Sequence, residues 1–308
     1  MNRPTLILLC GLPGSGKTHY AKQILKDVCY KKEDKAIHLS SDGIRQELYG
    51  NEAIQGDPSE VFSLMQQRAV DALNNGLDVI YDSTAMTRKD RAGIIVACPK
   101  FANIQCHIVW APIEVCIERD AARERTVGKE VINRMLKRFQ APYYDEGIDN
   151  IYIHLSDKNF DAYEYTNNLI ANMEIPHDNP HHTLNILDHC AYAGNYIIEK
   201  LGFHQDFSGI LWTAALYHDI GKPYVKAFVD SKGNTCDTAH YYQHQCVGSW
   251  MSYGMTVPID GPGYKMFDIA WLISTHMDPY LNTKYYNKLP AYLKKQVDLL
   301  HEADRNAH

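Results

Sequence analysis

Apolar residues form short continuous runs in the first half of the chain and recur at helical spacing in the second half. The first run, Thr5–Cys10, has no polar alternation, which is typical of a parallel strand covered on both faces. Runs at 36–41, 78–81 and 102–111 predict further strands, and helical periodicity follows each of them. This alternation predicts an α/β domain with a parallel sheet. From His177 onward the pattern predicts helices alone, and therefore an all-α second domain.

A phosphate-binding motif directly follows the first strand. The residues from Gly11 to Thr18 fit G-x-x-x-x-G-K-[ST], and apolar residues at helical spacing begin just after them. Glycine N–H groups and a helix N-terminus can converge there on phosphate oxygens. We expect ATP or another NTP to bind with Mg²⁺, with Lys17 on the β- and γ-phosphates and Thr18 on the ion. A glycine-rich turn without a ligand is the competing interpretation, and the flanking strand and helix argue against it. The binding residues are Gly11, Pro13, Gly14, Ser15, Gly16, Lys17 and Thr18.

Acidic residues end the second and third predicted strands. Asp42 follows the second strand, with Arg45 one helical turn later, and Asp82 follows the third. These positions lie on the edge at which α/β sheets bind ligands. The pattern leaves two roles open for Asp42, a site residue or the N-cap of the next helix.

Two arginines lie four residues apart on a helix predicted to begin at Pro112. At this spacing Arg119 and Arg123 leave the same helix face. One interpretation is a solvent-exposed helix face on which neighbouring acidic residues pair with the two arginines. The other is that the two arginines bind the phosphoryl group and stabilise its charge.

Over about residues 4–156 these features resemble the 5′-hydroxyl polynucleotide kinases of the phage RNA-repair type. The resemblance implies ATP-dependent phosphorylation of RNA or DNA ends, with Asp42 as the general base. It implies that Arg45 holds the neighbouring phosphate of the acceptor and that Asp82 supports Arg45. Arg123, with Arg119 as the alternative lid residue, would grip the nucleotide.

Residues 151–308 carry 12 of the 15 histidines. Among them, His218 and Asp219 are adjacent in an apolar helical segment. Burying such a pair is costly unless a cation receives both side chains. Mixed imidazole and carboxylate ligands suit Mn, Fe, Co, Ni or Mg better than a closed structural zinc site. We therefore expect a divalent metal in this half.

This half resembles the HD phosphohydrolase superfamily over about residues 176–308. The resemblance implies that Lys222 contacts substrate phosphate. His182 remains an alternative to His189, and His240 an alternative to His244 at i,i+4 on one predicted helix face. The implied ligands are His189, His218, Asp219 and Asp304 for a first metal, with His244 and His276 added for a second.

We therefore expect a P-loop kinase domain over 1–156, a connecting segment over 157–175 and an HD domain over 176–308. The expected function is bifunctional healing of nucleic-acid ends: phosphorylation of 5′-hydroxyls and removal of 2′,3′-cyclic or 3′-phosphates. Nucleic-acid ends are then the partners, and a ligase is a functional partner. The alternatives are a small-molecule or tRNA-directed kinase with an HD nucleotidase, and a nucleotide-sensing regulator.

Composition adds limits to this assignment. The net charge of −6 argues against bulk nucleic-acid binding. Residues 1–150 hold 20 of the 31 basic and 20 of the 37 acidic residues, so the second half carries the whole deficit. Eight scattered cysteines form no C-x-x-C pair and indicate no disulfide framework. We find no apolar run of membrane-spanning length and no cleavable signal, and therefore expect a cytoplasmic protein.

Overall fold

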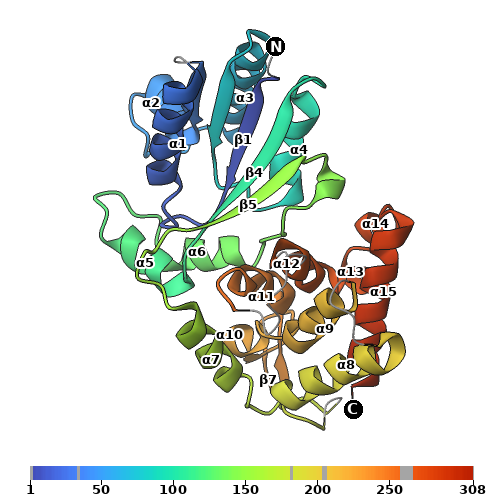
Figure 1. Cartoon of the computed structure of the whole chain (residues 1–308). Coiled ribbons are helices and arrows are strands. Elements are labelled where there is room, and N and C mark those ends of the chain that lie inside the picture. Colours follow the sequence, from blue (N-terminus) through green and yellow to red (C-terminus); the bar gives the residue numbers. More distant parts are fainter. Residues whose placement is uncertain (1–2, 33–34, 181–182, 203–206, 257–265, 308) are drawn as a thin grey trace. The chain divides into compact units, whose positions relative to one another are not determined.

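The computed structural model describes residues 3–32, 35–180, 183–202, 207–256 and 266–307 (Figure 1). The chain divides into two compact units. One comprises Met1–Met135 and Pro142–Lys158, and the other comprises Leu136–Ala141 and Asn159–His308.

The segment 136–141 belongs to the second unit through its side chains and backbone. The ring of Phe139 packs edge-on against Trp250, with 5.3 Å between centroids, and the N–H of Ala141 donates to Ser274 Oγ at 3.3 Å. The predicted domain ranges do not separate this segment, and they stay a prediction.

The first unit is built around the predicted parallel sheet, in the order β2-β3-β1-β4-β5. The central strand β1 is buried along its whole length, as its unbroken apolar run requires. The strands are β1 (Thr5–Cys10), β2 (Ala36–Ser40), β3 (Asp78–Asp82), β4 (Asn103–Trp110) and β5 (Asn150–Leu155).

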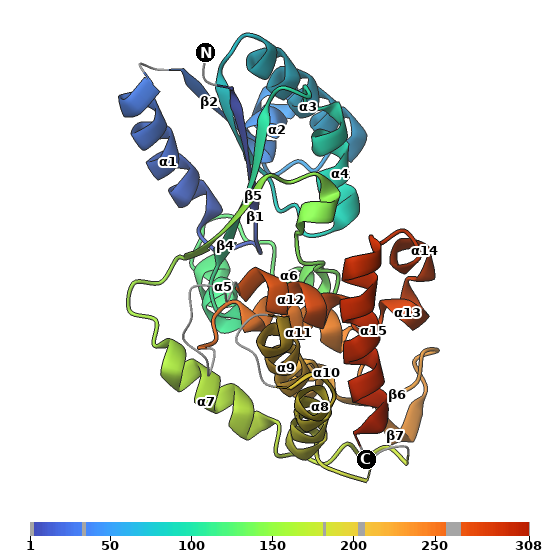
Figure 2. The same ribbon diagram turned by 45° about the vertical axis from the view of Figure 1, so that its right-hand side comes forward.

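Helices lie on both faces of this sheet. Helix α1 (Lys17–Lys32) lies on one side, and α3 (Pro58–Asn74) and α4 (Arg88–Ala97) lie on the other (Figure 2). The shorter helices α2 (Ser41–Tyr49), α5 (Ile113–Ala121) and α6 (Lys129–Leu136) follow strands or loops at the carboxyl edge. Because Asp82 pairs in register with both Leu9 and Ser40, the ends of three strands meet at this edge.

The second unit is helical, as predicted, and contains one hairpin that the pattern did not predict. The indoles of Trp250 and Trp271 are fully buried in its core. The hairpin pairs β6 (Ala227–Val229) with β7 (Thr235–His240). The helices are α7 (Ala162–Asn172), α8 (Ile186–Leu201), α9 (Phe207–Tyr217), α10 (Lys222–Val225), α11 (His244–Ser252), α12 (Met266–Thr275), α13 (Asp278–Leu281), α14 (Thr283–Tyr286) and α15 (Ala291–Asn306).

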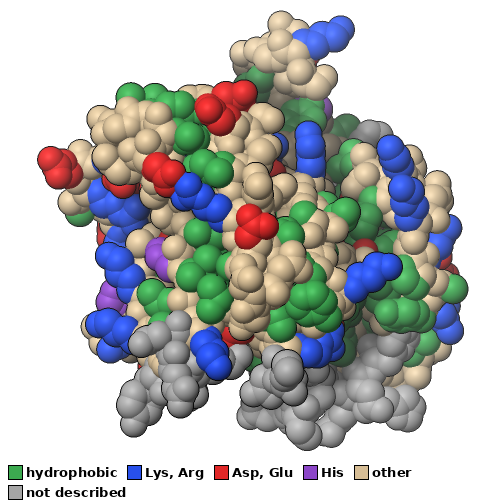
Figure 3. Space-filling model, turned by 90° about the horizontal axis from the view of Figure 1, so that it is seen from above, with side chains coloured by type: hydrophobic (Ala, Val, Ile, Leu, Met, Phe, Trp, Pro, Cys, Tyr) green, Lys and Arg blue, Asp and Glu red, His purple; other side chains and the backbone are tan. Residues whose placement is uncertain are grey.

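Charged side chains of both signs are interspersed with apolar ones over the face shown in Figure 3. None of the described helices combines the length and the apolar character needed to cross a membrane. All eight cysteines are free thiols.

Candidate functional site

The loop that joins β1 to α1 has the shape of a phosphate cradle. Gly14 has a φ of 80°, which favours glycine, and a Cβ at this position would lie 2.1 Å from the carbonyl oxygen of Cys116. The Nζ of Lys17 donates to the carbonyl oxygens of Gly11 and Leu12, both at 2.9 Å. The ammonium group is therefore held at the loop that would receive the phosphates.

Asp82, at the end of β3, lies beside this loop. Its Oδ2 accepts a hydrogen bond from Thr18 Oγ1 at 3.0 Å and lies 3.2 Å from Nε2 of His38. Burial lowers the pKa of Lys17, and the Asp82 carboxylate opposes this shift. Among the described residues, the Asp82 side chain has its polar contacts with Thr18 and His38, whereas the resemblance implied support of Arg45. A P-loop hydroxyl next to a strand-end carboxylate is the pair that holds Mg²⁺ in P-loop NTPases.

Asp42 lies in the first turn of α2, and Ser40 provides the N-cap of that helix. Asp42 Oδ1 accepts hydrogen bonds from Arg45 Nη1 at 3.0 Å and from Arg125 Nη1 at 3.3 Å. The Asp42 side chain is 53% exposed, whereas that of Arg45 is only 11% exposed. Asp42 therefore presents its carboxylate to solvent between two guanidinium groups instead of capping the helix.

These groups line one cleft of about 620 Å³ at the carboxyl edge of the sheet. This volume suits a nucleotide-sized ligand. Gly11 and Ser15 lie below its surface as buried parts of the loop. The lining includes Pro13, Gly14, Gly16, Lys17, Thr18, Asp42, Arg45, Asp82, Arg123 and Arg125.

The predicted pairing of Arg119 and Arg123 on one helix face is wrong. Helix α5 ends at Ala121, because the buried carboxylate of Asp120 accepts hydrogen bonds from the N–H groups of Val127 and Gly128 and turns the chain away. Arg119 Nη1 donates to a serine hydroxyl, that of Ser156, at 2.9 Å. Arg123 instead lies in the loop after α5 and lines the cleft together with Arg125.

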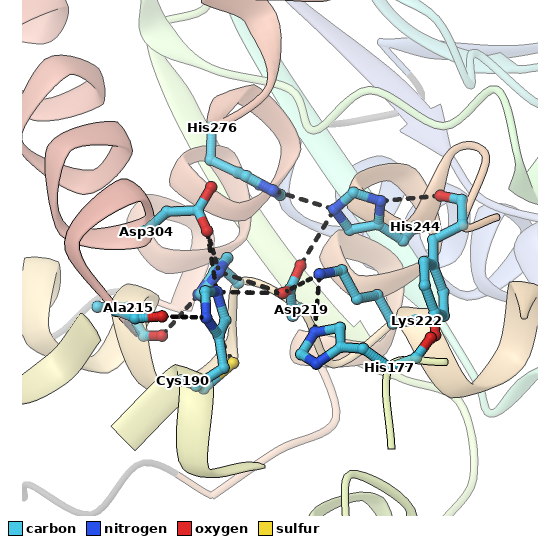
Figure 4. Close-up of polar contacts among 12 residues, drawn as sticks. His177, Cys190, Ala215, Asp219, Lys222, His244, His276 and Asp304 are labelled. Carbon is cyan, nitrogen blue, oxygen red and sulfur yellow. Dashed lines mark hydrogen bonds and ion pairs between the residues drawn. The ribbon is translucent and has the colours of Figure 1, made fainter. Parts of the chain in front are cut away.

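The second unit brings imidazole and carboxylate groups from five separate places together (Figure 4). One comes from α8, two from the turn after α9, one from the start of α11, one from the residue after α12 and one from α15. In that order they are His189, His218, Asp219, His244, His276 and Asp304.

Close backbone packing brings two of these elements together. Gly221 follows the turn that carries Asp219, and a Cβ on Gly221 would lie 2.1 Å from the carbonyl oxygen of His244 and 2.6 Å from the backbone nitrogen of Gly248. Only glycine allows this approach, so Gly221 allows α11 to pack beside Asp219.

All four imidazoles are oriented in the same way. Each Nδ1 lies 2.8 to 2.9 Å from a backbone carbonyl oxygen, which can only accept, so each Nδ1 carries a proton. The Nε2 atoms consequently point inward, as they do in histidines that bind metals. The carbonyls belong to Ala307, Ala215, Tyr241 and Ile273, for His189, His218, His244 and His276 respectively.

Four of the donors form a first group. Asp304 Oδ1 lies 2.9 Å from His189 Nε2 and 3.3 Å from His218 Nε2. Asp219 Oδ2 lies 3.4 Å from His218 Nε2 and 3.7 Å from His189 Nε2. The ring nitrogens here face carboxylate oxygens at short distances, and a cation could bind between them.

The second group shares Asp219 with the first. Asp219 Oδ1 lies 3.2 Å from His244 Nε2, which in turn lies 3.1 Å from His276 Nε2. Burial lowers the pKa of His276 to about 3, and the neighbouring His244 adds to this shift. Two ring nitrogens this close, beside a carboxylate, can bind a cation between them. The donor sets therefore fit one ion each, with Asp219 as the shared ligand.

Comparison with known proteins agrees with both halves of this description. Residues 6–142 match the AAA domain family, and residues 181–305 match the HD domain family. The chain joins a kinase-like P-loop domain to an HD domain.

Proteins of several kinds are similar to part of this chain. The L-seryl-tRNA(Sec) kinase of Methanococcus maripaludis is 29% identical over 142 residues, 44% of this chain and 53% of that protein. The transcription factor bHLH140 of Arabidopsis thaliana is 26% identical over 164 residues, 51% of this chain and 16% of that protein. A chain of the Pnkp1/Rnl/Hen1 RNA repair complex is 20% identical, with a TM-score of 0.40, over 53% of this chain and 52% of that one. The chain thus spans about half the length of these proteins or less.

Two alternatives among the HD-domain histidines have different outcomes. His182 lies outside the described residues. His240 ends β7 and stacks on Tyr242 with 5.3 Å between ring centroids, away from both donor groups. The predicted helix face shared by His240 and His244 is wrong, because the hairpin ends at His240 and α11 begins only at His244.

The sequence did not single out three residues that contact these sites. Arg125 binds Asp42 in the P-loop domain. In the HD domain, His177 Nε2 lies 3.2 Å from Lys222 Nζ, and Tyr241 supplies the carbonyl that orients His244. Burial lowers the pKa of His177 to about 4, and the Lys222 ammonium adds to the shift. Of these three residues, only Arg125 could have been found from the sequence, because it is an ionisable residue next to a motif that had been assigned.

Proposed function

We propose that this protein heals nucleic-acid ends: its P-loop domain phosphorylates 5′-hydroxyls with ATP, and its HD domain removes 2′,3′-cyclic or 3′-phosphates. One observation carries the kinase half. The Asp42 carboxylate lies in the same cleft as Lys17 and Thr18, and two guanidinium groups contact it. A nucleotide switch has no use for such an acceptor site.

The proposed kinase step assigns a role to each group. The loop and Lys17 bind the phosphates of ATP, while Thr18 and Asp82 hold Mg²⁺. Asp42 accepts the proton of the attacking hydroxyl as its oxygen forms a bond to the γ-phosphorus and the bond to the ADP oxygen breaks. Arg45 and Arg125 bind the phosphate next to the acceptor hydroxyl. The remaining expected nucleotide contacts, Arg119 and Arg123, stay proposals.

The proposed hydrolase half rests on the two donor groups of the HD domain. Mn, Fe, Co, Ni or Mg would suit their mixed imidazole and carboxylate ligands. When bound, such ions lower the pKa of a water molecule and neutralise phosphoryl oxygens. Asp219 bridges the two sites, His189, His218 and Asp304 complete one, and His244 and His276 complete the other. Lys222 lies at the site, with Nζ 2.5 Å from Asp219 Oδ2, and would bind a phosphoryl oxygen.

The two halves fit a single purpose. A 5′-phosphate and a 3′-hydroxyl are the ends that a nucleic-acid ligase joins, which makes a ligase the proposed functional partner. A tRNA-directed kinase is a second candidate for the P-loop half, because the relative with 29% identity is an L-seryl-tRNA(Sec) kinase.

Acceptor competition tests the kinase proposal. Labelled ATP is offered with a 5′-hydroxyl oligonucleotide, with free nucleosides and with seryl-tRNA. We expect transfer to the oligonucleotide, and loss of transfer in Asp42→Asn. The matched control is Asp71→Asn, since Asp71 is exposed on α3 and outside the cleft. Transfer to seryl-tRNA or nucleosides alone, or full activity of Asp42→Asn, would overturn the assignment.

A further inference from the structure

Lys222 is an unusual lysine because it is 93% buried within the HD domain, with only 7% of its surface exposed. A buried ammonium is costly unless charged or polar partners compensate it. Asp219 Oδ2 lies 2.5 Å from Lys222 Nζ, and the face of the Tyr241 ring lies 5.4 Å away, within reach of a cation–π interaction.

The third partner of Lys222 is His177, which neither the metal groups nor the proposed chemistry uses. His177 is only 1% exposed and comes from the segment before α8. Its Nδ1 lies 2.8 Å from the carbonyl oxygen of Leu184 and must donate to it. The Nε2 lone pair is thereby fixed, and it accepts a hydrogen bond from Lys222 Nζ at 3.2 Å.

His177 is itself held in place by the chain that carries the second metal group. The hydroxyl of Tyr241 donates to the carbonyl oxygen of His177, and the carbonyl oxygen of Tyr241 accepts from His244 Nδ1 at 2.9 Å. Figure 4 shows Lys222 extended between Asp219 and His177. The ammonium thus has a defined direction within a rigid network.

An ammonium group has three N–H donors. Among the described residues, Asp219 and His177 engage two of the N–H donors of Lys222, which leaves one for a ligand. We propose that His177 is a positioning residue that fixes Lys222, so that the remaining N–H binds a phosphoryl oxygen of the substrate. This inference rests on the proposed phosphohydrolase function and adds to it a residue that no metal group contains.

Binding of inorganic phosphate to the full chain loaded with Mn²⁺ tests this proposal without turnover. We compare His177→Ala, His177→Gln, Lys222→Ala and the double variant His177→Ala with Lys222→Ala by calorimetry. Mn²⁺ content and thermal melting are recorded for each. The matched control is His240→Ala, since His240 belongs to the same domain and lies outside both donor groups.

We expect His177→Ala to weaken phosphate binding about tenfold, because the hydrogen bond it loses involves a charged group. Glutamine offers one acceptor and one donor, so His177→Gln restores most of the affinity. Adding His177→Ala to Lys222→Ala produces no further loss, and Mn²⁺ content is unchanged throughout. The control binds phosphate like the wild type.

Three results would overturn the inference. The first is wild-type phosphate affinity in His177→Ala, and the second is that His177→Ala lowers phosphate affinity equally in the presence and absence of Lys222. The third is a loss of bound Mn²⁺ that accompanies the loss of phosphate binding. The first two leave the proposed hydrolase intact. A Mn²⁺-loaded wild type that binds no phosphate and hydrolyses no phosphate ester would instead overturn the hydrolase proposal, and the inference with it.

Discussion

The two candidate sites of this chain are built in opposite ways. In the P-loop domain, consecutive residues shape the loop, and Asp42 stands 53% exposed in an open cleft. In the HD domain the donors come from five places in the sequence, and His218 and His276 have no exposed surface. The first site exposes its charged groups to solvent, whereas the second encloses donor groups that could bind a metal ion.

This difference has an energetic consequence. In the P-loop cleft, Asp42 already contacts Arg45, and Lys17 already donates to two carbonyl oxygens. In the HD domain, ring nitrogens and carboxylates are instead gathered in one buried site, where a bound cation would stabilise them. We therefore expect the second unit to depend on its metal for stability and the first unit to be independent of it.

The largest expected effect follows from the shared position of Asp219. Asp219→Asn removes the ligand common to both donor groups, so we expect a loss of about 10⁴-fold in phosphate-ester hydrolysis. Bound Mn²⁺ falls as well, by elemental analysis. Kinase activity of the same preparation is the internal control. Hydrolysis within tenfold of wild type would show that the donor groups are not the hydrolytic centre.

Asp42→Asn tests the other side of the comparison. Removing a general base costs about 10³-fold in the transfer rate. The measurement is the initial rate of 5′-phosphorylation at saturating ATP, with hydrolysis by the HD domain as the control. If both activities fell together, the variant would be acting through folding instead of chemistry.

Metal removal separates the stabilities of the two units. An ion present at 100 times its Kd stabilises the native state by about 2.7 kcal/mol. After chelation we expect faster hydrogen exchange in α8, α11 and α12, and unchanged exchange in β1, β3 and β4. Faster exchange in the sheet as well would contradict the independence of the first unit.

A smaller effect concerns pH and the first unit. Burial lowers the pKa of His107 to about 3 and that of His154 to about 4, with the neighbouring His154 adding to the shift of His107. Between these values and about 6.5 the unfolded chain binds protons that the folded chain does not, so stability is full above this window and falls as the pH drops through it. For His107, which is 8% exposed, the loss from pH 7 to pH 5 is about 2 kcal/mol.

His107→Gln should therefore flatten the pH dependence of unfolding for the first unit, as measured by urea titration at pH 7 and pH 5. The exposed His19 provides the matched control, His19→Gln. An equal pH dependence in all three proteins would show that the burial of His107 has no such consequence.

The sequence predicted best what is local. The P-loop, the strand-end acids Asp42 and Asp82, and the sheet could be predicted because each depends on spacing within a few residues. The HD pair was recognisable because two hydrophilic residues stood in an apolar segment. The resemblance supplied the remaining HD donors that the structure then brought together, but it could not show that they share Asp219.

What the sequence could not predict depends on tertiary contacts. Arg123 lies outside α5 because the side chain of Asp120 binds backbone N–H groups seven and eight residues later and ends the helix. The placement of His240 follows from strand pairing in a short hairpin. His177 lies 45 residues from Lys222, and nothing in its own segment indicates that contact.

The most direct test of the account uses one RNA oligonucleotide with a 5′-hydroxyl and a 2′,3′-cyclic phosphate, incubated with the full chain, ATP, Mg²⁺ and Mn²⁺. Mass spectrometry of the product should show a phosphate gained at the 5′ end and the cyclic phosphate hydrolysed to a free hydroxyl at the other. Asp42→Asn should block only the first change, and Asp219→Asn only the second. An RNA left unaltered at both ends, by a preparation that phosphorylates seryl-tRNA or a small molecule, would contradict the central claim.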